Sequence, residues 1–463
     1  MLNETSTVQD LLDEIQVAKE KLIKQKKIKK IRNLPDISDK EELFKIPKNW
    51  KWMRLGEVIQ IINGDRGKNY PSKKELKETG NIPFISALNI KNNTISNEHL
   101  LYVDKERYDV LRSGKLSKGD IVLCIRGSLG KNGRYPYECG AIASSLVIIR
   151  SYLNVDGIYR YISLYLNSIL FQKELSKYDN GTAQPNLGAK DLALFAVPVP
   201  PLSEQQRLVA RIESLFAKLD AAKEKVQAVL DAHETRKAAL LHDAFAGKLT
   251  AKWREARGVT GDVYQSMPLA DVCKSIFDGD HMPPPKSSRG IPFLVISNVN
   301  KGKLDFSETR FVPQDYYDKL TDTRKPESGD VLYTLVGTYG IPVLVDTDQA
   351  FCFQRHMALL KPKEDVILQR YLWYALQEKD FYREATRIAK GTAQLTVPIK
   401  GLRQLTIPMA SLPEQQEIVA VLDRLLGREE EVRQSAESVL AAIDSMKQSI
   451  LARAFRGELG VGA

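Results

Sequence analysis

The chain has 463 residues, of which 43% are hydrophobic and 27% charged, and its formal net charge is +10. This length predicts about three domains, and no apolar run approaches the ~20 residues that span a bilayer. The polar, acidic start lacks the pattern of a secretory signal, so we expect a cytoplasmic protein with no membrane partner. The excess of cations favours a polyanion such as nucleic acid as partner. The four cysteines lie far apart and lack metal-ligand spacing, which predicts reduced, mostly buried thiols.

Residues 1–48 are expected to form an N-terminal basic helix and a linker. The helix is predicted over Val8–Arg32, with apolar residues early and an almost solidly basic later part. Such a helix either is a solvated surface element or lies near DNA phosphates or docks on a partner. Pro35 and Pro47 mark the linker.

Residues 49–201 form the first mixed segment. Short apolar runs alternate there with turns rich in Gly and Asn, which predicts strands. One helix is expected over Val155–Lys177, and the prolines of Val197–Pro201 mark the end of the segment.

Residues 202–262 are predicted to form a long helix followed by a short charged linker from Ala251. Apolar residues recur with the 3-4 spacing of a coiled-coil seam, in rows that start at Leu208 and Ile212. The first row contains Leu208, Leu215, Ala222 and Val229. The acidic segment Glu204–Gln206, capped by Ser203, is either an ordinary helix start or a partner surface.

The second half of the chain repeats this order, with a mixed segment at 263–411 and a long helix at 412–463. Glu204-Gln205-Gln206 returns 210 residues later as Glu414-Gln415-Gln416, and Gly181-Thr182-Ala183-Gln184 returns as Gly391-Thr392-Ala393-Gln394. The second helix carries the corresponding row Ile418, Leu425, Val432, Val439 and Met446.

The predicted fold class is therefore α+β, a pseudo-twofold tandem duplication. Two mixed α/β domains are separated and followed by long helices that pair as an antiparallel coiled coil, because neither helix can bury its apolar stripe alone. The two domains share a skeleton and differ in their loops, so we expect two like frames to bind two different targets.

The motifs of several enzyme classes are absent from the sequence. There is no Asn/Asp-Pro-Pro-aromatic tetrapeptide of an amino-methyltransferase and no P-loop, and the five histidines form no metal-binding pattern. We therefore assign no catalytic, cofactor-binding or metal-binding residue, although a nuclease site of scattered carboxylates stays open. The alternatives are a stand-alone DNA methyltransferase or nuclease with a fused reader, and a coiled-coil scaffold without sequence-specific DNA binding.

The chain resembles the specificity subunit of type I restriction-modification systems. The resemblance is carried by Ile46–Trp52 at the entrance to the first domain, by Val197–Leu202 before Glu204, and by Gln354-Arg355-His356. The second entrance, Ser266–Val272, differs because it lacks the paired tryptophans of the first.

The resemblance implies that each mixed domain is a target recognition domain for one half of a bipartite, asymmetric double-stranded DNA site. It implies that the coiled coil sets the spacer between the halves and docks modification subunits, and the pseudo-twofold repeat suggests two of them. Those subunits would bind S-adenosylmethionine and methylate adenine, and restriction subunits would join through them and use ATP and magnesium. The chain itself is then non-catalytic and holds none of these cofactors.

The candidate DNA-binding residues lie in loops rich in glycine and polar residues, which can approach phosphates and base edges closely. In the first domain they are Arg66, Lys68, Tyr70, Lys73, Lys74, Arg126, Ser128, Lys131 and Arg134. In the second they are His281, Lys286, Ser288, Arg289, Thr338, Tyr339, Gln354, Arg355 and His356. Arg355 could equally pair with a carboxylate inside the fold. The repeated Gly-Thr-Ala-Gln turns favour a structural or phosphate-binding role, because they are identical in two domains that should read different sequences.

Overall fold

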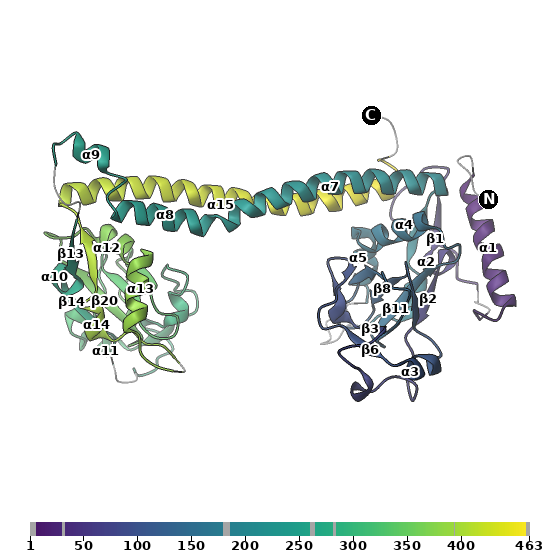
Figure 1. Ribbon diagram of the computed structural model, residues 1–463, viewed down its shortest axis with the longest axis horizontal. Helices are drawn as coiled ribbons and strands as arrows, with labels where there is room; N and C mark the ends of the chain where they lie inside the picture. Colours follow the sequence, from purple (N-terminus) through teal and green to yellow (C-terminus); the bar gives the residue numbers. More distant parts are fainter. Residues whose placement is uncertain are drawn as a thin grey trace. The chain divides into compact units, whose positions relative to one another are not determined.

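The computed structural model describes residues 6–29, 33–178, 186–259, 264–280, 284–392 and 394–459. The chain divides into two compact units, unit 1 with Met1–Lys225 and Leu440–Ala463, and unit 2 with Val226–Val439. Each unit contains a mixed α/β domain and a segment of paired long helices (Figure 1). Within the described ranges, no helix is both long and apolar enough to cross a membrane.

Unit 1 is built on three sheets. A two-stranded sheet pairs β1 (Lys51–Arg54) with β12 (Ala196–Val199). A six-stranded sheet has the order β2 (Ile59–Asn63), β11 (Leu146–Ser151), β8 (Ile121–Cys124), β9 (Asn132–Arg134), β5 (Thr94–Ile95), β4 (Ile90–Lys91). A four-stranded sheet has the order β6 (Leu101–Val103), β3 (Ile82–Ile85), β10 (Cys139–Ile142), β7 (Lys115–Ser117). The helices of its domain are α1 (Val8–Lys24), α2 (Leu55–Val58), η1 (Lys73–Glu75), η2 (Ala87–Asn89), α3 (Lys105–Val110), α4 (Asp156–Leu166), α5 (Ile169–Ser176) and α6 (Ala189–Ala193).

Unit 2 repeats this sheet plan with fewer strands. Its two-stranded sheet pairs β13 (Gln265–Pro268) with β21 (Thr406–Met409). The larger sheet has the order β14 (Cys273–Asp278), β20 (Met357–Pro362), β17 (Val331–Thr334), β18 (Pro342–Leu344), and the third has β16 (Arg310–Val312), β15 (Ile291–Leu294), β19 (Cys352–Phe353). Its helices are α9 (Ala251–Glu255), α10 (Leu269–Val272), η3 (Ile296–Asn298), α11 (Gln314–Asp318), η4 (Asp322–Arg324), α12 (Gln369–Ala375), α13 (Lys379–Ile388) and α14 (Ile399–Leu402).

The two domains also share internal contacts, so the duplication predicted from the sequence is confirmed. The hydroxyl of Tyr161 donates to the Pro198 carbonyl at 2.6 Å, and Tyr371 donates to Pro408 at 2.7 Å. A mostly buried ion pair recurs between equivalent strands, as Arg150 with Asp120 and as Lys361 with Asp330. The shared frame is therefore built from the same side-chain roles as well as from the same strand order.

The long helices are α7 (Leu202–Asp231), α8 (His233–Phe245) and α15 (Leu412–Phe455). In unit 1 the end of α15 contributes to the domain core, where Phe455 packs on Tyr161 and Tyr165 of α4. In unit 2 the end of α8 does the same, since Phe245 packs on Tyr371 of α12. In unit 1 Lys223 pairs with Asp444 and Asp220 with Lys447, so the two helix segments run antiparallel. In unit 2 Arg236 of α8 pairs with Glu429 of α15.

The predicted coiled-coil seam is only partly buried. Leu208, Ile212, Ile418, Leu422, Ala436 and Ile443 are buried as expected. The prediction is wrong for Ala222, Val229, Val432, Val439 and Met446, which are exposed. Two helices that pair bury only the face turned to the partner, so the rest of an apolar stripe faces solvent.

Several element boundaries also differ from the predictions. The N-terminal helix ends at Lys24, and Lys26 adopts a φ of 56°. The helix predicted over Val155–Lys177 is two helices, because Ser168 breaks it and caps α5 through the amide of Phe171. The first long helix is interrupted at Ala232. The charged linker begins with helix α9, and the prolines of the predicted boundary lie inside or just after strand β12.

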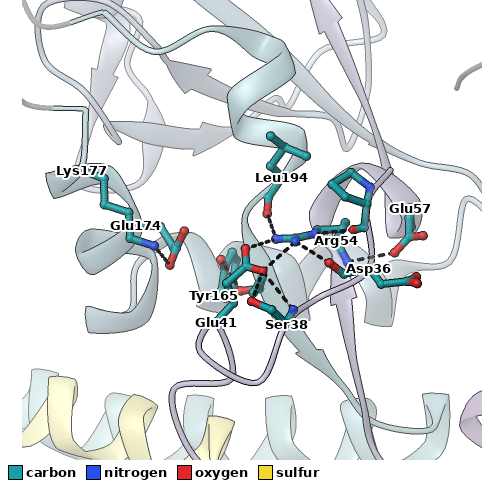
Figure 2. A network of polar contacts seen from close by, with 11 residues as sticks. Asp36, Ser38, Glu41, Arg54, Glu57, Tyr165, Glu174, Lys177 and Leu194 are labelled. Atoms are coloured by element: carbon teal, nitrogen blue, oxygen red, sulfur yellow. Dashed lines mark hydrogen bonds and ion pairs between the residues drawn. The ribbon is translucent and has the colours of Figure 1, made fainter. Parts of the chain in front are cut away.

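A buried arginine joins the N-terminal linker to the domain of unit 1. The Arg54 guanidinium donates to the carbonyls of Pro35, Asp36 and Leu194 and forms a forked pair with Glu41 (Figure 2). Ser38 also donates to the Glu41 carboxylate, and these hydrogen bonds hold its pKa at about 2, well below its ordinary value. Helix α1 adds Leu11 and Ile15, both buried in the core of unit 1.

Candidate nucleic-acid interface

The first basic loop of unit 1 follows strand β2. Gly64 lets the loop pass close to the domain, because a Cβ there would lie 3.0 Å from the Ala143 carbonyl oxygen. The Asp65 carboxylate accepts from the amides of Arg66 and Arg112, both at 2.7 Å, which fixes the start of the loop. Arg66 and Lys68 then project from it, with Gly67 between them at a φ of +83°.

Most cations of this loop form no ion pair among the described residues. Arg66, Lys68, Lys73 and Lys74 are exposed, and none of them pairs with a carboxylate in the part of the chain that the structure describes. Lys77 differs because it pairs with Asp104 at 2.8 Å. Unpaired, exposed cations on a fixed loop are suited to DNA phosphates, since binding need not break an existing pair.

Tyr70 has a structural position in the same loop. Its ring packs edge-on against Phe84 with the centroids 5.9 Å apart, and its hydroxyl oxygen lies 3.5 Å from the Ser144 amide nitrogen. These contacts favour a role in holding the loop rather than in touching DNA.

The second loop of unit 1 connects β8 to β9. Arg126 donates to the Asn186 side chain at 3.0 Å, and Lys131 donates to the Ala87 carbonyl at 3.0 Å, while Ser128 is exposed between them. Lys131 and Arg126 have no carboxylate partner among the described residues, so their charges are not neutralised. Arg134 differs because it pairs with Asp156 and lies over the Tyr159 ring.

In unit 2 the structure brings Lys286, Gln354 and Arg355, which were predicted, and Arg310, which was not, to one pocket of about 340 Å³. Its polar lining consists of Asp280, Lys286, Arg310, Gln354 and Arg355, and its apolar lining includes Phe293 and Phe311. Tyr316 donates to Asp280 at 3.1 Å, and this bond together with burial raises the pKa of the Tyr316 hydroxyl.

The three cations of this pocket keep their charges available. Lys286, Arg310 and Arg355 are exposed, and within the described ranges none of them forms an ion pair. The alternative in which Arg355 pairs with an internal carboxylate therefore finds no support. Cations, an amide and aromatic rings around one pocket are suited to the acceptors and flat faces of nucleic acid.

The remaining candidates of unit 2 differ in how exposed their side chains are. Ser288, Arg289 and Thr338 are exposed and can face a ligand. Tyr339 is buried, stacks on Tyr382 and donates to Thr386 at 3.1 Å, which favours a structural role. His356 is half-buried, and burial and the nearby Arg355 lower its pKa, so it is a neutral neighbour of the pocket. His281 lies outside the described residues.

Arg310 was missed by the sequence reasoning. It stands on strand β16 at the position that Leu101 occupies on β6 of unit 1, since each pairs with the equivalent phenylalanine of the neighbouring strand. The signal that could have revealed Arg310 is the difference between the two repeats: the second has a charged residue where the first has an apolar one.

The helix starts at Glu204 and Glu414 are anchors to the domains rather than free surfaces. Glu414 is buried and accepts from Thr250 at 2.7 Å, from Tyr264 at 2.9 Å and from Arg254 at 2.5 Å. Gln205 and Gln415 are also buried, and each donates to a carbonyl just before its helix. The helix-start interpretation therefore accounts for Gln205, Glu414 and Gln415, whereas Gln206 and Gln416 are exposed and the partner-surface alternative stays a prediction for them.

The repeated Gly-Thr-Ala-Gln turns are only partly visible. The first copy and Ala393 of the second lie outside the described residues. In the second copy a Cβ on Gly391 would lie 2.3 Å from the Gln394 carbonyl oxygen, and Gly391 has a φ of +119°. A tight turn that only glycine can make favours the structural interpretation.

One group of side chains in unit 2 has the composition of a metal site. His242, Glu378 and Asp380 bring ligand atoms within 4.8 Å of one another. However, Glu378 caps α13 through the amides of Asp380 and Phe381, and Asp380 pairs with Arg383. These contacts account for both carboxylates, so we assign no metal there.

Comparisons with known proteins identify the family of the chain. The model of the type I restriction modification DNA specificity domain matches twice, at residues 47–231 and 262–437. The chain is 26% identical over 436 residues to the type I restriction enzyme EcoKI specificity subunit of Escherichia coli K12, covering 90% of each chain. It is also 26% identical over 440 residues to the StySPI specificity subunit of Salmonella potsdam, again covering 90% of each.

Solved structures share the fold. The crystal structure of the HsdS subunit from Thermoanaerobacter tengcongensis matches with a TM-score of 0.55 and 19% identity, over 90% of this chain and 99% of that one. A chain from a study of the assembly and conformational transition of the type I R-M system matches with a TM-score of 0.70 and 20% identity, over 90% of this chain and all of the other. The two domain matches together cover most of the sequence, and the chain belongs to the type I restriction modification DNA specificity family.

Proposed function

We propose that this chain is the DNA-recognition subunit of a type I restriction-modification complex, in which each domain reads one half of a bipartite double-stranded DNA site. The observation that carries the proposal is that one frame occurs twice with different side chains on its loops. Unit 1 presents mainly lysines and arginines, whereas unit 2 presents a pocket with arginines, an amide and a carboxylate. Equal frames with unequal surfaces suit the recognition of an asymmetric site.

The proposed DNA-facing residues are exposed or half-buried and form no ion pair among the described residues. In unit 1 they are Arg66, Lys68, Lys73, Lys74, Arg126, Ser128 and Lys131, and in unit 2 Lys286, Ser288, Arg289, Arg310, Thr338, Gln354 and Arg355. Tyr70, Arg134 and Tyr339 are proposed to hold these loops in place, because their printed contacts lie within the fold.

The long helices are proposed to set the spacer and to dock modification subunits. Val432 and Val439 of α15 are each 44% exposed in unit 2, although other apolar residues of this helix, such as Leu422 and Ala436, are buried. Exposed apolar residues in such a row suit a protein partner. The pseudo-twofold repeat suggests two modification subunits, and restriction subunits would join through them.

The chain is proposed to be non-catalytic and to act in the cytoplasm, where its DNA target lies. S-adenosylmethionine, ATP and magnesium would be bound by the partner subunits, since the sequence carries none of the corresponding motifs. The proposed domain boundaries are 1–48, 49–201, 202–262, 263–411 and 412–463, and the two family matches fall on the segments assigned to recognition and coil.

A methylation map tests the proposal. The full chain would be expressed with its modification subunit in cells that lack other such systems, and methylated adenines would be mapped over the genome. One bipartite motif with methylated adenines in both halves is expected. Exchange of residues 50–200 for those of a relative should then change one half only.

Two outcomes contradict the proposal. Absence of any motif, with a folded modification subunit present, would mean that the chain is a scaffold. Methylation by the isolated chain would mean that it is itself an enzyme.

A further inference from the structure

The pocket of unit 2 has an equivalent place in unit 1, and strand register identifies it residue by residue. Phe293 pairs with Arg310 on one side and with Cys352 on the other, just as Phe84 pairs with Leu101 and Ala141. Beyond these strands the Gln354 amide donates to the Leu294 carbonyl, as the Ala143 amide donates to Ile85. Gln354 and Arg355 therefore stand where unit 1 has Ala143 and Ser144.

The two units carry side chains of different polarity and charge at this place. In unit 2 the three variable positions hold Arg310, Gln354 and Arg355, and they line an open pocket. In unit 1 the same positions hold Leu101, Ala143 and Ser144, none of which carries a charge. There the Tyr70 ring packs on Phe84 and its hydroxyl reaches the Ser144 amide, so a side chain covers the place.

The rest of the surroundings is shared. Gly64 and Gly279 both lie against a neighbouring segment of backbone. A Cβ added to Gly64 would lie 3.0 Å from the Ala143 carbonyl oxygen, and a Cβ added to Gly279 would lie 2.4 Å from the Phe353 carbonyl oxygen. Each glycine is followed by an aspartate, Asp65 or Asp280. Since the frame is constant and only the exposed polar side chains change, the change concerns what the place binds rather than how the domain folds.

We propose that Arg310, Gln354 and Arg355 are the specificity-determining residues of unit 2, and that they read a base pair containing guanine. This inference rests on the proposed function and assigns its sequence-reading residues. An arginine matches the two acceptors of the guanine major-groove edge with two parallel hydrogen bonds from a rigid planar fork, and the flexible lysine ammonium has no such fork. Gln354, between Arg355 and strand β19, is placed to contact the neighbouring base. Unit 1 reads its half-site elsewhere, because Tyr70 covers the equivalent place.

Substitutions that keep the charge test this assignment. Arg310→Lys and Arg355→Lys would be made in the full chain and methylation mapped with the modification subunit present. The half-site of unit 2 is the half that does not change when residues 50–200 are exchanged. We expect each variant to lose the preference for guanine at one position of that half by about tenfold or more, with the other half unchanged.

A matched control is Arg383→Lys, because Arg383 is an exposed arginine of the same unit that pairs with Asp380 in its own helix. Its motif should equal that of the wild type. Ser144→Ala, at the covered place of unit 1, should leave both halves unchanged.

Three outcomes would overturn the inference. A half-site of unit 2 without a guanine on either strand would contradict it directly. Retained guanine preference in both lysine variants would contradict a forked arginine contact with guanine. A motif that changes only in the half read by unit 1 would show that the pocket does not read the half-site assigned to it. These results leave a bipartite motif in the wild type, whereas failure of the proposed function abolishes that motif altogether.

Discussion

Individual cations of this chain have different roles because their partners differ. Arg54 is buried and its donors are all used within the fold, whereas Arg66 and Lys73 are exposed without an ion pair among the described residues. A paired arginine must lose its carboxylate before it can bind a phosphate, and an unpaired one need not. The partner rather than the residue type therefore separates structural from DNA-facing cations.

The lysines of helix η1 should contribute to DNA affinity through counterion release. Each phosphate contact adds about 0.9 to the slope of log affinity against log salt concentration. We expect Lys73→Ser/Lys74→Ser to weaken binding of the reconstituted complex and to lower this slope by about 2. Fluorescence anisotropy with the mapped site at several salt concentrations measures it.

The control for this pair is Lys105→Ser/Lys118→Ser, which removes two lysines of the same domain that face Asp109 and Glu138. Its slope should stay near that of the wild type. An equal loss of slope in both double variants would show that only total charge matters.

The Glu41 carboxylate should make the free energy of unfolding of unit 1 depend on pH. Its pKa of about 2 lies below the ordinary 4.5 because Arg54 and Ser38 donate to the carboxylate. The carboxylate therefore stabilises the fold fully above pH 4.5, and this contribution is lost as the pH falls toward 2. The Glu41 side chain is 40% exposed, so we expect Glu41→Gln to cost only about 1 kcal/mol at neutral pH.

Chemical unfolding followed by tryptophan fluorescence at pH 7, 4 and 3 checks this prediction. The difference in the free energy of unfolding between the wild type and Glu41→Gln should shrink as the pH falls. Glu42→Gln is the control, since Glu42 is an exposed neighbour. The same difference in unfolding free energy at all three pH values would argue against a stabilising contribution of the Arg54–Glu41 ion pair.

The long helices begin on the domains through two equivalent glutamates with unequal surroundings. Glu414 at the start of α15 accepts from Thr250, Arg254 and Tyr264 in a buried site, whereas Glu204 at the start of α7 accepts from Asn49 at 2.9 Å in an exposed one. The same motif therefore forms a strong junction in unit 2 and a weaker one in unit 1.

Removal of these two carboxylates should destabilise the two junctions by different amounts. Glu414→Ala leaves the largely buried Arg254 without its partner, and we expect it to destabilise unit 2 by about 3 kcal/mol or more. Glu204→Ala, the repeat-equivalent control, should cost about 1 kcal/mol or less. Amide hydrogen exchange of residues 250–264 and 412–420 measures the destabilisation by Glu414→Ala. Equal protection of these amides in the Glu414→Ala and Glu204→Ala variants would contradict the expected difference between the two junctions.

The duplicated chain combines two recognition domains with helices that continue through both units, and the spacer prediction concerns the molecule as a whole. In unit 1, Lys223 pairs with Asp444, and Asp220 pairs with Lys447. Residues 217–223 therefore face residues 444–450. Deletion of both segments removes one heptad from each helix and keeps the remaining rows in register.

This double deletion should shorten the spacer of the methylated motif and keep both half-sites. Seven helical residues correspond to about 10 Å, or about three base pairs. Deletion of 217–223 alone is the control, and it should abolish methylation because the two helices then differ in length. An unchanged spacer in the double deletion would refute the idea that the helices set it.

Local pattern in the sequence was sufficient for the fold class, the duplication and the helix pair. Constant spacing of motifs such as Glu204-Gln205-Gln206 and seven-residue apolar rows are properties of neighbouring residues. They predict repeats and periodic helices without knowledge of which elements pack together. The sequence also located the glycine-rich, polar loops from which DNA-facing candidates come.

Only the tertiary structure decided which candidates are free to act. Arg134 is paired with Asp156, 22 residues away, and Tyr339 stacks on Tyr382. Arg310 meets Arg355 at one pocket because β15 lies between β16 and β19. Whether a charge is neutralised or a ring is covered depends on residues distant in the sequence, and strand pairing determines which ones those are.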